Sequence, residues 1–394
     1  MHNTDLDVLR TQLLLYATRE LGTYAQMPNL VKRDLSSSIL SQKTDKIRIS
    51  VSEMLYDRGE TIGTTAANVQ KVGRREIDLM FYNRESPVRM NMDDYRKIDI
   101  NANIFPDVIT ELSRAIALTI NRKILMGYRD IYNITGTVST SPFSADASAL
   151  TAAKTKLLVA PKNDRFLILN EYDAERASNL SGFTTTNAGQ VSETGDFVKK
   201  LGFNIFVDPD IHTHVAGTGA DMLVNGIAAK GATSVAIDSV TGGTLMYGDI
   251  ITFAGHQQTY VCGKGEFEGK HNDDDQAQGI DLDYTSVSDV TSAIIDIQPP
   301  LQAEVADNAA ITLTPTHNVS LAYQKNAFIY APRAVEFMGD SEYRKTLTEP
   351  TTGTPLKFTV QDEWKQQTSS LDAYYGTGTL YDGFGVRLIG QPYV

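Results

Sequence analysis

The residues most able to do chemistry in this sequence are six histidines and one cysteine. His212 and His214 stand two positions apart, so in a strand their imidazoles would lie on one side, where zinc could bind them. No cysteine–histidine pair nearby completes such a site, and we expect two solvated loop histidines instead. Cys262 lies in an apolar run, which favours an inert, packed thiol over a nucleophile.

An acidic segment, HNDDDQAQGIDLD at residues 271–283, could in principle bind a cation. An EF-hand loop needs alternating ligands and a glycine at its sixth position. Counted from Asp273, the fifth and sixth positions are Ala277 and Gln278, so the template fails. We expect a charged contact loop or a plain solvated loop, and the candidate contact residues in it are Asp273, Asp274 and Asp275.

Short motifs for nucleotide binding and hydrolysis are incomplete in this chain. The run Gly263-Lys264-Gly265 lacks the leading glycine and the following Ser or Thr of a Walker A loop. The pair Gly217 and Gly219 lacks the third glycine and the helix of a dinucleotide-binding turn. We therefore expect no catalytic residue, no cofactor and no metal site, and we expect that the protein is not an enzyme.

Bulk composition narrows the class of protein. A chain of 394 residues exceeds one ordinary core, so two or three domains are expected. The formal net charge of −12 excludes a chain that is cationic as a whole and binds nucleic acid for that reason. One local basic group remains, formed by Lys71, Arg74 and Arg75. The sequence shows neither an apolar run of membrane-spanning length nor the features of a signal peptide.

The longest periodic stretch is NIFPDVITELSRAIALTINRKILMGY, residues 103–128. It predicts an amphipathic helix over Pro106–Gly127, about 33 Å long at ~1.5 Å per residue. Its apolar positions recur at three and four: Phe105, Val108, Ile109, Leu112, Ala115, Ile116, Ile120 and Ile124. We expect the core positions of this helix to be Val108, Leu112, Ile116 and Ile120.

The residues before this helix predict a short helix, an irregular N-terminal arm and a two-stranded β-arm. A helix over Asp5–Leu21, ended by Gly22, precedes an irregular arm at Met27–Ser41. Alternating runs at Lys46–Val51 and Arg75–Tyr82 then predict two strands joined by a long Gly-, Thr- and charge-rich stretch. An isolated two-stranded arm is marginal in water, so we expect this one to lie on another subunit. A polar link after Pro87 should lead to the long helix.

After the long helix, the pattern mixes helices and strands. A helix capped by Ser144 is expected to run to Leu158, followed by a buried strand at Arg165–Leu169, a helix at Glu171–Leu180 and a strand within Lys199–Pro209. Residues 217–317 instead show short β runs split by glycine and proline turns, which predict a small barrel or sandwich. This region looks inserted because mixed patterning resumes after it.

The C-terminal part predicts strands at Leu356–Asp362, Ser370–Tyr375 and Gly383–Leu388. A tight glycine turn, Tyr375-Gly376-Thr377-Gly378, is expected between the last two. The alternating helices and strands between residues 144 and 209 predict an α+β or α/β lobe, and we expect the fold class of the whole chain to be α+β.

The order of these elements resembles that of the major capsid proteins of tailed bacteriophages, which share the Hong Kong 97-type fold. Two runs, KGATSVAIDSVTGGTLMYGDIITFAG (Lys230–Gly255) and SLDAYYGTGTLYDGFGVRLIGQP (Ser370–Pro392), are similar to the coat proteins of short-tailed phages that carry an inserted β-barrel. The resemblance implies five parts: an N-terminal arm (1–45), an E-loop β-arm (46–82), a P domain with a spine helix (83–129 and 346–394), an A domain (130–216 and 318–345) and an inserted all-β barrel domain (217–317).

The resemblance also implies a function. Many copies would assemble as hexamers and pentamers into an icosahedral shell around double-stranded DNA, which the inner face would contact non-specifically. Implied partners are a scaffolding protein, a portal and decoration proteins, with no membrane; the implied location is the virion capsid, assembled in the bacterial cytoplasm. Contacts between subunits would use Asp57, Arg58, Glu60, Lys71, Arg74, Arg75 and the acidic segment. Two alternatives stay open: an encapsulin-type nanocompartment shell, and a soluble α/β enzyme with an accessory β-domain.

Overall fold

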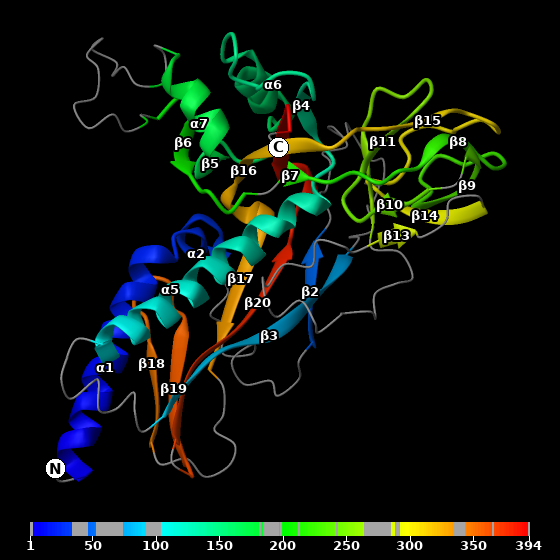
Figure 1. The fold of residues 1–394 in the computed structure, drawn as a ribbon. Helices are drawn as coiled ribbons and strands as arrows, with labels where there is room; N and C mark the ends of the chain where they lie inside the picture. Colours follow the sequence, from blue (N-terminus) through cyan, green and yellow to red (C-terminus); the bar gives the residue numbers. More distant parts are fainter. Residues whose placement is uncertain are drawn as a thin grey trace, which may run out of the picture. The chain divides into compact units, whose positions relative to one another are not determined.

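The computed structural model describes residues 3–33, 46–52, 74–91, 104–180, 183, 197, 199–211, 213–241, 243–263, 285–287, 292–334, 343–364 and 366–392 (Figure 1). The chain is an α+β protein, as the sequence predicted, and it divides into two compact units. The first unit contains residues Met1–Tyr24, Arg33–Ile116 and Ile329–Leu380; the second contains Ala25–Lys32, Ala117–Phe328 and Tyr381–Val394. No described helix is long and apolar enough to cross a membrane.

A seven-stranded sheet forms most of the first unit. Its strand order is β1-β17-β20-β19-β18, with β3 also paired to β20 and β2 paired to β3. Along β19, Leu356, Phe358 and Val360 are buried while the residues between them are half-buried, which is the period of a strand with one face on a core. The bounds are β1 (Lys32–Arg33), β2 (Lys46–Ser52), β3 (Arg74–Asn91), β17 (Phe328–Arg333), β18 (Tyr343–Thr348), β19 (Pro355–Glu363) and β20 (Gln366–Thr379).

Strand β3 changes partner partway along its 18 residues. Residues 81–91 pair antiparallel with β20, and residues 74–80 pair antiparallel with β2. The two strands of the predicted arm are thereby confirmed. The polar link expected after Pro87 is wrong, because β3 continues to Asn91 with Pro87 opposite Ser370. Prolines in sheets occur mainly in edge strands, and β20 is the one described partner of this part of β3.

Strand β20 runs through the glycines that were expected to form a tight turn. Gly376 lies opposite Phe81, and the strand ends only at Thr379. A Cβ at Gly378 would lie 3.0 Å from Cδ1 of Leu79, which is fully buried. The expected turn is therefore wrong: Gly378 gives room for close side-chain packing near the end of a strand.

Helix α1 (Asn3–Tyr24) packs with the first unit through Leu13, Leu14, Ala17 and Leu21. The predicted stop at Gly22 is wrong, since the helix continues to Tyr24. A side chain at position 22 would collide with Glu349, because a Cβ there would lie 2.6 Å from Oε1 of that residue. The irregular arm expected from Met27 is also wrong in its described part, where the largely buried helix α2 (Met27–Leu30) precedes the exposed two-residue strand β1.

We expect Gly22→Ala to destabilise the first unit by about 1–3 kcal/mol, although alanine favours a helix by ~1 kcal/mol. The Glu349 carboxylate cannot easily move away because it accepts from Thr351 N (2.9 Å) and from Thr352 Oγ1 (2.6 Å). Urea unfolding compared with Gln12→Ala, an exposed position of the same helix, measures the effect. A Gly22→Ala protein as stable as wild type would contradict the contact.

Helix α5 (Ile104–Leu125) has the predicted length of 22 residues and leads into a 3-10 turn, η1 (Met126–Asp130). Ile116 and Ile120 are buried, Val108 and Leu112 are half-buried, and Ala115 is exposed. Its buried face also carries two polar residues: Ser113 Oγ donates to Ala17 O (2.6 Å), and Asn121 Oδ1 accepts from Met27 N (3.2 Å). These bonds tie helix α5 to α1 and to the start of α2.

One six-stranded sheet of the second unit has the order β4-β21-β16-β5-β6, with β7 also paired to β16. The bounds are β4 (Ile134–Gly136), β5 (Arg165–Leu169), β6 (Phe203–Val207), β7 (Thr213–His214), β16 (His317–Gln324) and β21 (Gly385–Gly390). Helices α6 (Ser148–Lys156) and α7 (Glu171–Ser178) share one core with alternate residues of this sheet, such as Leu167 and Leu169. The expected Ser144 cap is wrong: α6 starts later, and Asp146 Oδ1 accepts from Ser148 N (2.8 Å).

The second six-stranded sheet lies wholly between residues 220 and 313 and has its own core, which includes Met222, Ile237, Phe253 and Tyr260. Its order is β15-β11-β12-β14-β9-β8. The outer strands meet at one end, where Val224 N donates to Ala309 O (3.0 Å). The bounds are β8 (Ala220–Val224), β9 (Ser234–Thr241), β11 (Ile250–Phe253), β12 (Tyr260–Cys262), β14 (Ser292–Gln298) and β15 (Ile311–Leu313); β10 (Leu245–Met246) and β13 (Thr285–Val287) form a separate pair.

Candidate functional site

Buried polar residues gather in the second unit between its two larger sheets. His214 comes from β7, which pairs with β16 so that His214 lies opposite His317. Asp249 directly precedes β11, and Arg387 lies in the middle of β21. We call His214, His317, Asp249 and Arg387, with Tyr128 of η1, the polar junction. All five side chains are almost or fully buried.

The histidine of the junction is held on both ring nitrogens. His214 Nε2 lies 2.9 Å from Asp249 Oδ1, and Nδ1 lies 3.2 Å from the Tyr128 hydroxyl. Asp249 accepts further bonds from Met246 N (2.7 Å) and Gly217 N (3.1 Å). Burial lowers the pKa of His214 below its ordinary value, opposed by the bond to Asp249. A neutral imidazole that donates to Asp249 and accepts from Tyr128 satisfies all these contacts.

Arg387 is the charged centre of the junction. Its guanidinium donates to Gly248 O (2.8 Å) and to Arg129 O (2.9 Å), and it lies over the ring of Tyr128 at 5.1 Å. Burial lowers the pKa of Arg387 to about 10, so it stays charged at neutral pH. Gly248 has φ +93°, and a Cβ there would meet Arg129 Cβ at 2.8 Å. One side chain thus joins β21, η1 and the segment before β11.

A tyrosine–histidine–aspartate chain is an arrangement that enzymes use to move protons. Here it has no room for a substrate, because the cavity beside Tyr128, His214 and Tyr247 has a volume of about 20 Å³. That space admits about one water molecule. Among the described residues, no group of three or more His, Cys, Asp or Glu could hold a metal ion. The geometry therefore supports a packed joint between the two sheets.

The structure places the residues that the sequence singled out as follows. His214 was expected in a solvated loop, and that expectation is wrong: it lies in a strand and is buried because Asp249 and Tyr128 satisfy it. Cys262 is confirmed as a buried thiol of β12, and burial raises its pKa. Outside the described residues lie His212, Asp57, Arg58, Glu60, Lys71, Asp273, Asp274 and Asp275; Arg74 and Arg75 begin β3, opposite Ser52 and Val51.

Sequence reasoning missed Arg387 and Asp249. Each is a charged residue next to or within a run that is otherwise apolar, GVRLIG for Arg387 and DIITF for Asp249. Every residue of β21 is buried. A charge inside a strand that is buried on both faces needs a partner, and this rule could have marked both residues.

The junction predicts a pH dependence of stability. Burial lowers the pKa of His317 to about 3, against ~6.5 in an unfolded chain. Below pH ~6.5 the unfolded chain binds a proton at this histidine that the folded protein does not bind. The free energy of unfolding therefore decreases as the pH is lowered, by about 2 kcal/mol between pH 7 and pH 5 for this group. Asp208 acts oppositely, since burial raises its pKa to about 6. Urea unfolding of His317→Asn should show a shallower pH slope than wild type; an unchanged slope would contradict this role.

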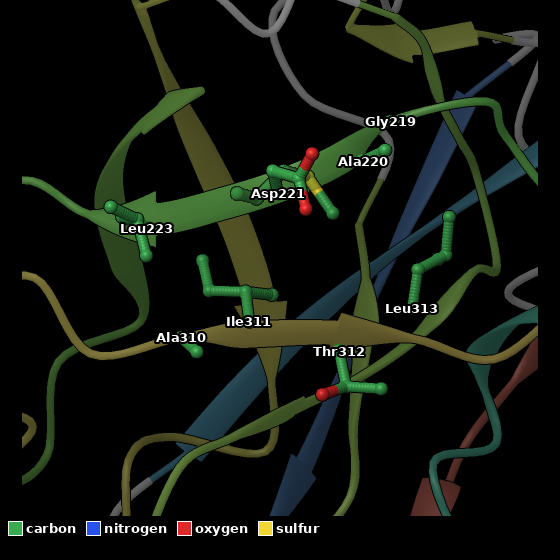
Figure 2. A pocket seen from close by; sticks show the side chains of 9 residues that line it. Gly219, Ala220, Asp221, Leu223, Ala310, Ile311, Thr312 and Leu313 are labelled. Carbon is green, nitrogen blue, oxygen red and sulfur yellow. The ribbon is translucent and has the colours of Figure 1, made fainter. Parts of the chain in front are cut away.

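A shallow groove of about 500 Å³ lies between β8 and β15, where the outer strands of the second sheet separate (Figure 2). Ile311 and Leu313 point from β15 toward β8, while Thr312 points away. Asp221, with φ 55°, is the one ionisable residue among the described residues that line it. A single carboxylate offers no acid–base pair. The groove is the gap between strands β8 and β15.

Comparisons with known proteins give likenesses of structure only. No family model matches the chain, and no curated protein matches it. It is similar to a chain of Mycobacterium phage Che8 (11% identity, 91% of this chain and 89% of that chain, TM-score 0.44). It is also similar to the capsids of cyanophage P-SCSP1u (10%, 92% and 87%, TM-score 0.46) and of bacteriophage PhiM1 (8%, 90% and 85%, TM-score 0.46). At these values the likenesses assign neither a family nor a function.

Proposed function

We propose that this protein is a structural shell subunit: a tailed-phage major capsid protein of the Hong Kong 97-type fold, whose copies associate as hexamers and pentamers into an icosahedral capsid. The observation that carries this proposal is the β2–β3 arm. Its strands pair over residues 46–52 and 74–80, beyond the part of β3 that pairs with β20. An arm of two strands has no adequate core of its own, so a surface of another copy is the natural support.

The helix α5 supports the same function. It is about twice as long as a usual helix, and its polar residues Ser113 and Asn121 hold backbone atoms of α1 and α2 rather than forming an open site. The polar junction likewise leaves no space for a substrate, since the cavity beside it is about 20 Å³. The buried polar groups thus stiffen the subunit, which is what a repeating shell unit needs.

We divide the subunit into domains by combining the resemblance to phage capsid proteins with the strand pairing of the sheets. We assign the N-terminal segment and the β2–β3 arm to contacts between subunits, and α5 with β18, β19 and β20 to the P domain. The sheet around β5 and β16 is assigned to the A domain, and residues 217–317 to an inserted β-barrel. Strand β21, expected in the P domain, pairs with β16 and β4, so we assign it to the A domain.

The proposed partners are other copies of the chain, a scaffolding protein, a portal, decoration proteins and packaged double-stranded DNA. The net charge of −12 suits a shell whose wall repels DNA during packaging. The proposed site of assembly is the cytoplasm of a bacterial host. An encapsulin-type shell would hold protein cargo instead, and the ratio of absorbance at 260 and 280 nm of purified particles from infected cells separates nucleic acid from protein cargo.

Deletion of residues Asp57–Lys71 tests the arm. The arm should then lose its cross-subunit support, and closed shells should become rare while the subunit remains folded. The matched control keeps the length and composition of residues 57–71 but scrambles their order, which separates specific contacts from mere chain length. Negative-stain microscopy and sedimentation give the readout. Normal shells from the deletion variant would show that the arm does not make the contacts between subunits.

A further inference from the structure

The turn after α6 carries two adjacent aliphatic side chains in solvent: Leu158 is 65% exposed and Val159 is 63% exposed. Single exposed apolar residues are ordinary, but neighbours on one turn form a contact point. Lys154 and Lys162 flank them; both are exposed, and neither forms an ion pair with another described residue. We call Lys154, Leu158, Val159 and Lys162 the α6 knob.

Hydrogen bonds from the Arg165 side chain fix the backbone of the α6 knob. Arg165, the first residue of β5, donates from Nη2 to Leu157 O (2.6 Å) and to Ala160 O (2.9 Å), and from Nε to Pro161 O (2.9 Å). Leu157 and Ala160 are buried. A preformed turn loses little conformational entropy when it binds, so its exposed residues are suited to contact.

Helix α7 presents the opposite charge. Glu171 and Glu175 lie one helical turn apart and are exposed, with no ion pair to another described residue. Tyr172 beside them is 49% exposed. The helix is anchored by Asp173, which accepts from Ser141 Oγ (2.7 Å) and Ser320 Oγ (2.6 Å). We call Glu171, Tyr172 and Glu175 the α7 face.

We propose that the α6 knob of one copy docks on the α7 face of the next copy. The lysines meet the glutamates, and Leu158 and Val159 cover Tyr172. Helix α6 contacts β4 and β21 whereas α7 contacts β5, so the α6 knob and the α7 face are two different surfaces of one subunit, although both helices pack into one core (Figure 1). If each pair of copies makes this contact once, the arrangement is head-to-tail, and it generates rings when the rotation closes. This inference rests on the proposed function and specifies how copies join within a ring.

A disulfide test reads the contact directly. Val159→Cys combined with Tyr172→Cys, oxidised in the assembled protein, should give a ladder of covalent multimers that stops at the ring size. Cys262 is fully buried and does not interfere. The matched control pairs Val159→Cys with Ile227→Cys, another strongly exposed aliphatic position of the second unit, and should give no ladder. Equal ladders from both pairs, or none from the first, would overturn the proposal.

Charge reversal gives a second, independent readout. Lys154→Glu with Lys162→Glu, or Glu171→Lys with Glu175→Lys, should lower the yield of particles about tenfold. The fourfold variant, which exchanges both charges, should restore assembly, and no folding defect produces such a rescue. If the wild type forms shells and both double variants assemble normally, this inference is wrong while the proposed function stands. If the wild type forms no assembly, the proposed function itself fails.

Discussion

Replacing Ile116 with aspartate should prevent the protein from folding and, with it, every form of assembly. Ile116 is 2% exposed, at the middle of the buried face of α5. An unpaired carboxylate there costs several kcal/mol or is neutralised at similar cost, which is comparable with the ~5–15 kcal/mol that stabilises a whole domain. We expect little soluble protein, a lost cooperative thermal transition and no particles by sedimentation.

The matched control is Ala115→Asp, one residue away on the exposed side of the same helix. It introduces the same charge with a helix-propensity cost of about 0.7 kcal/mol or less, and it should fold. If Ile116→Asp assembles as well as Ala115→Asp, then the buried face of α5 does not support the fold. Leu112 is only half-buried, and its replacement should have an intermediate effect.

Replacing Arg387 with methionine should destabilise the second unit by about 3–5 kcal/mol, the usual cost of removing one partner from a buried charged network. The loss would leave Gly248 O and Arg129 O without the donors that now serve them. It would also leave Asp249 without the nearby positive charge of Arg387. Urea unfolding followed by tyrosine fluorescence and circular dichroism measures the change.

Arg176→Met is the control for this variant, because Arg176 is an exposed arginine of α7 and its loss should cost under about 1 kcal/mol. Arg387→Lys should recover only part of the stability, since an ammonium cannot reproduce the planar, two-armed donation to two carbonyls. Equal stability of the Arg387→Met and Arg176→Met proteins would show that the junction does not join the sheets.

The sequence predicted elements that depend on local periodicity. The 3.6-residue period of α5 and the alternation in β2 and the start of β3 reflect one buried face each, and the structure has these elements within two residues or so at each end. The β runs between residues 217 and 317 were visible for the same reason. None of these features needs knowledge of a distant partner.

Features that depend on long-range contacts were not predictable from local pattern. Gly22 and Gly378 look like chain breakers, yet each lies inside a regular element because a side chain distant in sequence, Glu349 or Leu79, occupies the space of a Cβ. His214 looked solvated because Asp249, 35 positions away, is not recognisable as its partner in the sequence. From the sequence, Arg387 and Asp249 could be recognised only as charges that need buried partners. Which residues are those partners could not be predicted.

Electron microscopy of the purified protein shows directly whether its copies form a shell. We expect closed, uniform icosahedral shells, or capsomer rings that close into shells when a scaffolding protein is supplied. The wild-type images should be compared at equal concentration with those of Ile116→Asp, which should show none. A stable, well-folded monomer that forms neither rings nor shells, with or without a scaffolding protein, would show that the protein is not a shell subunit.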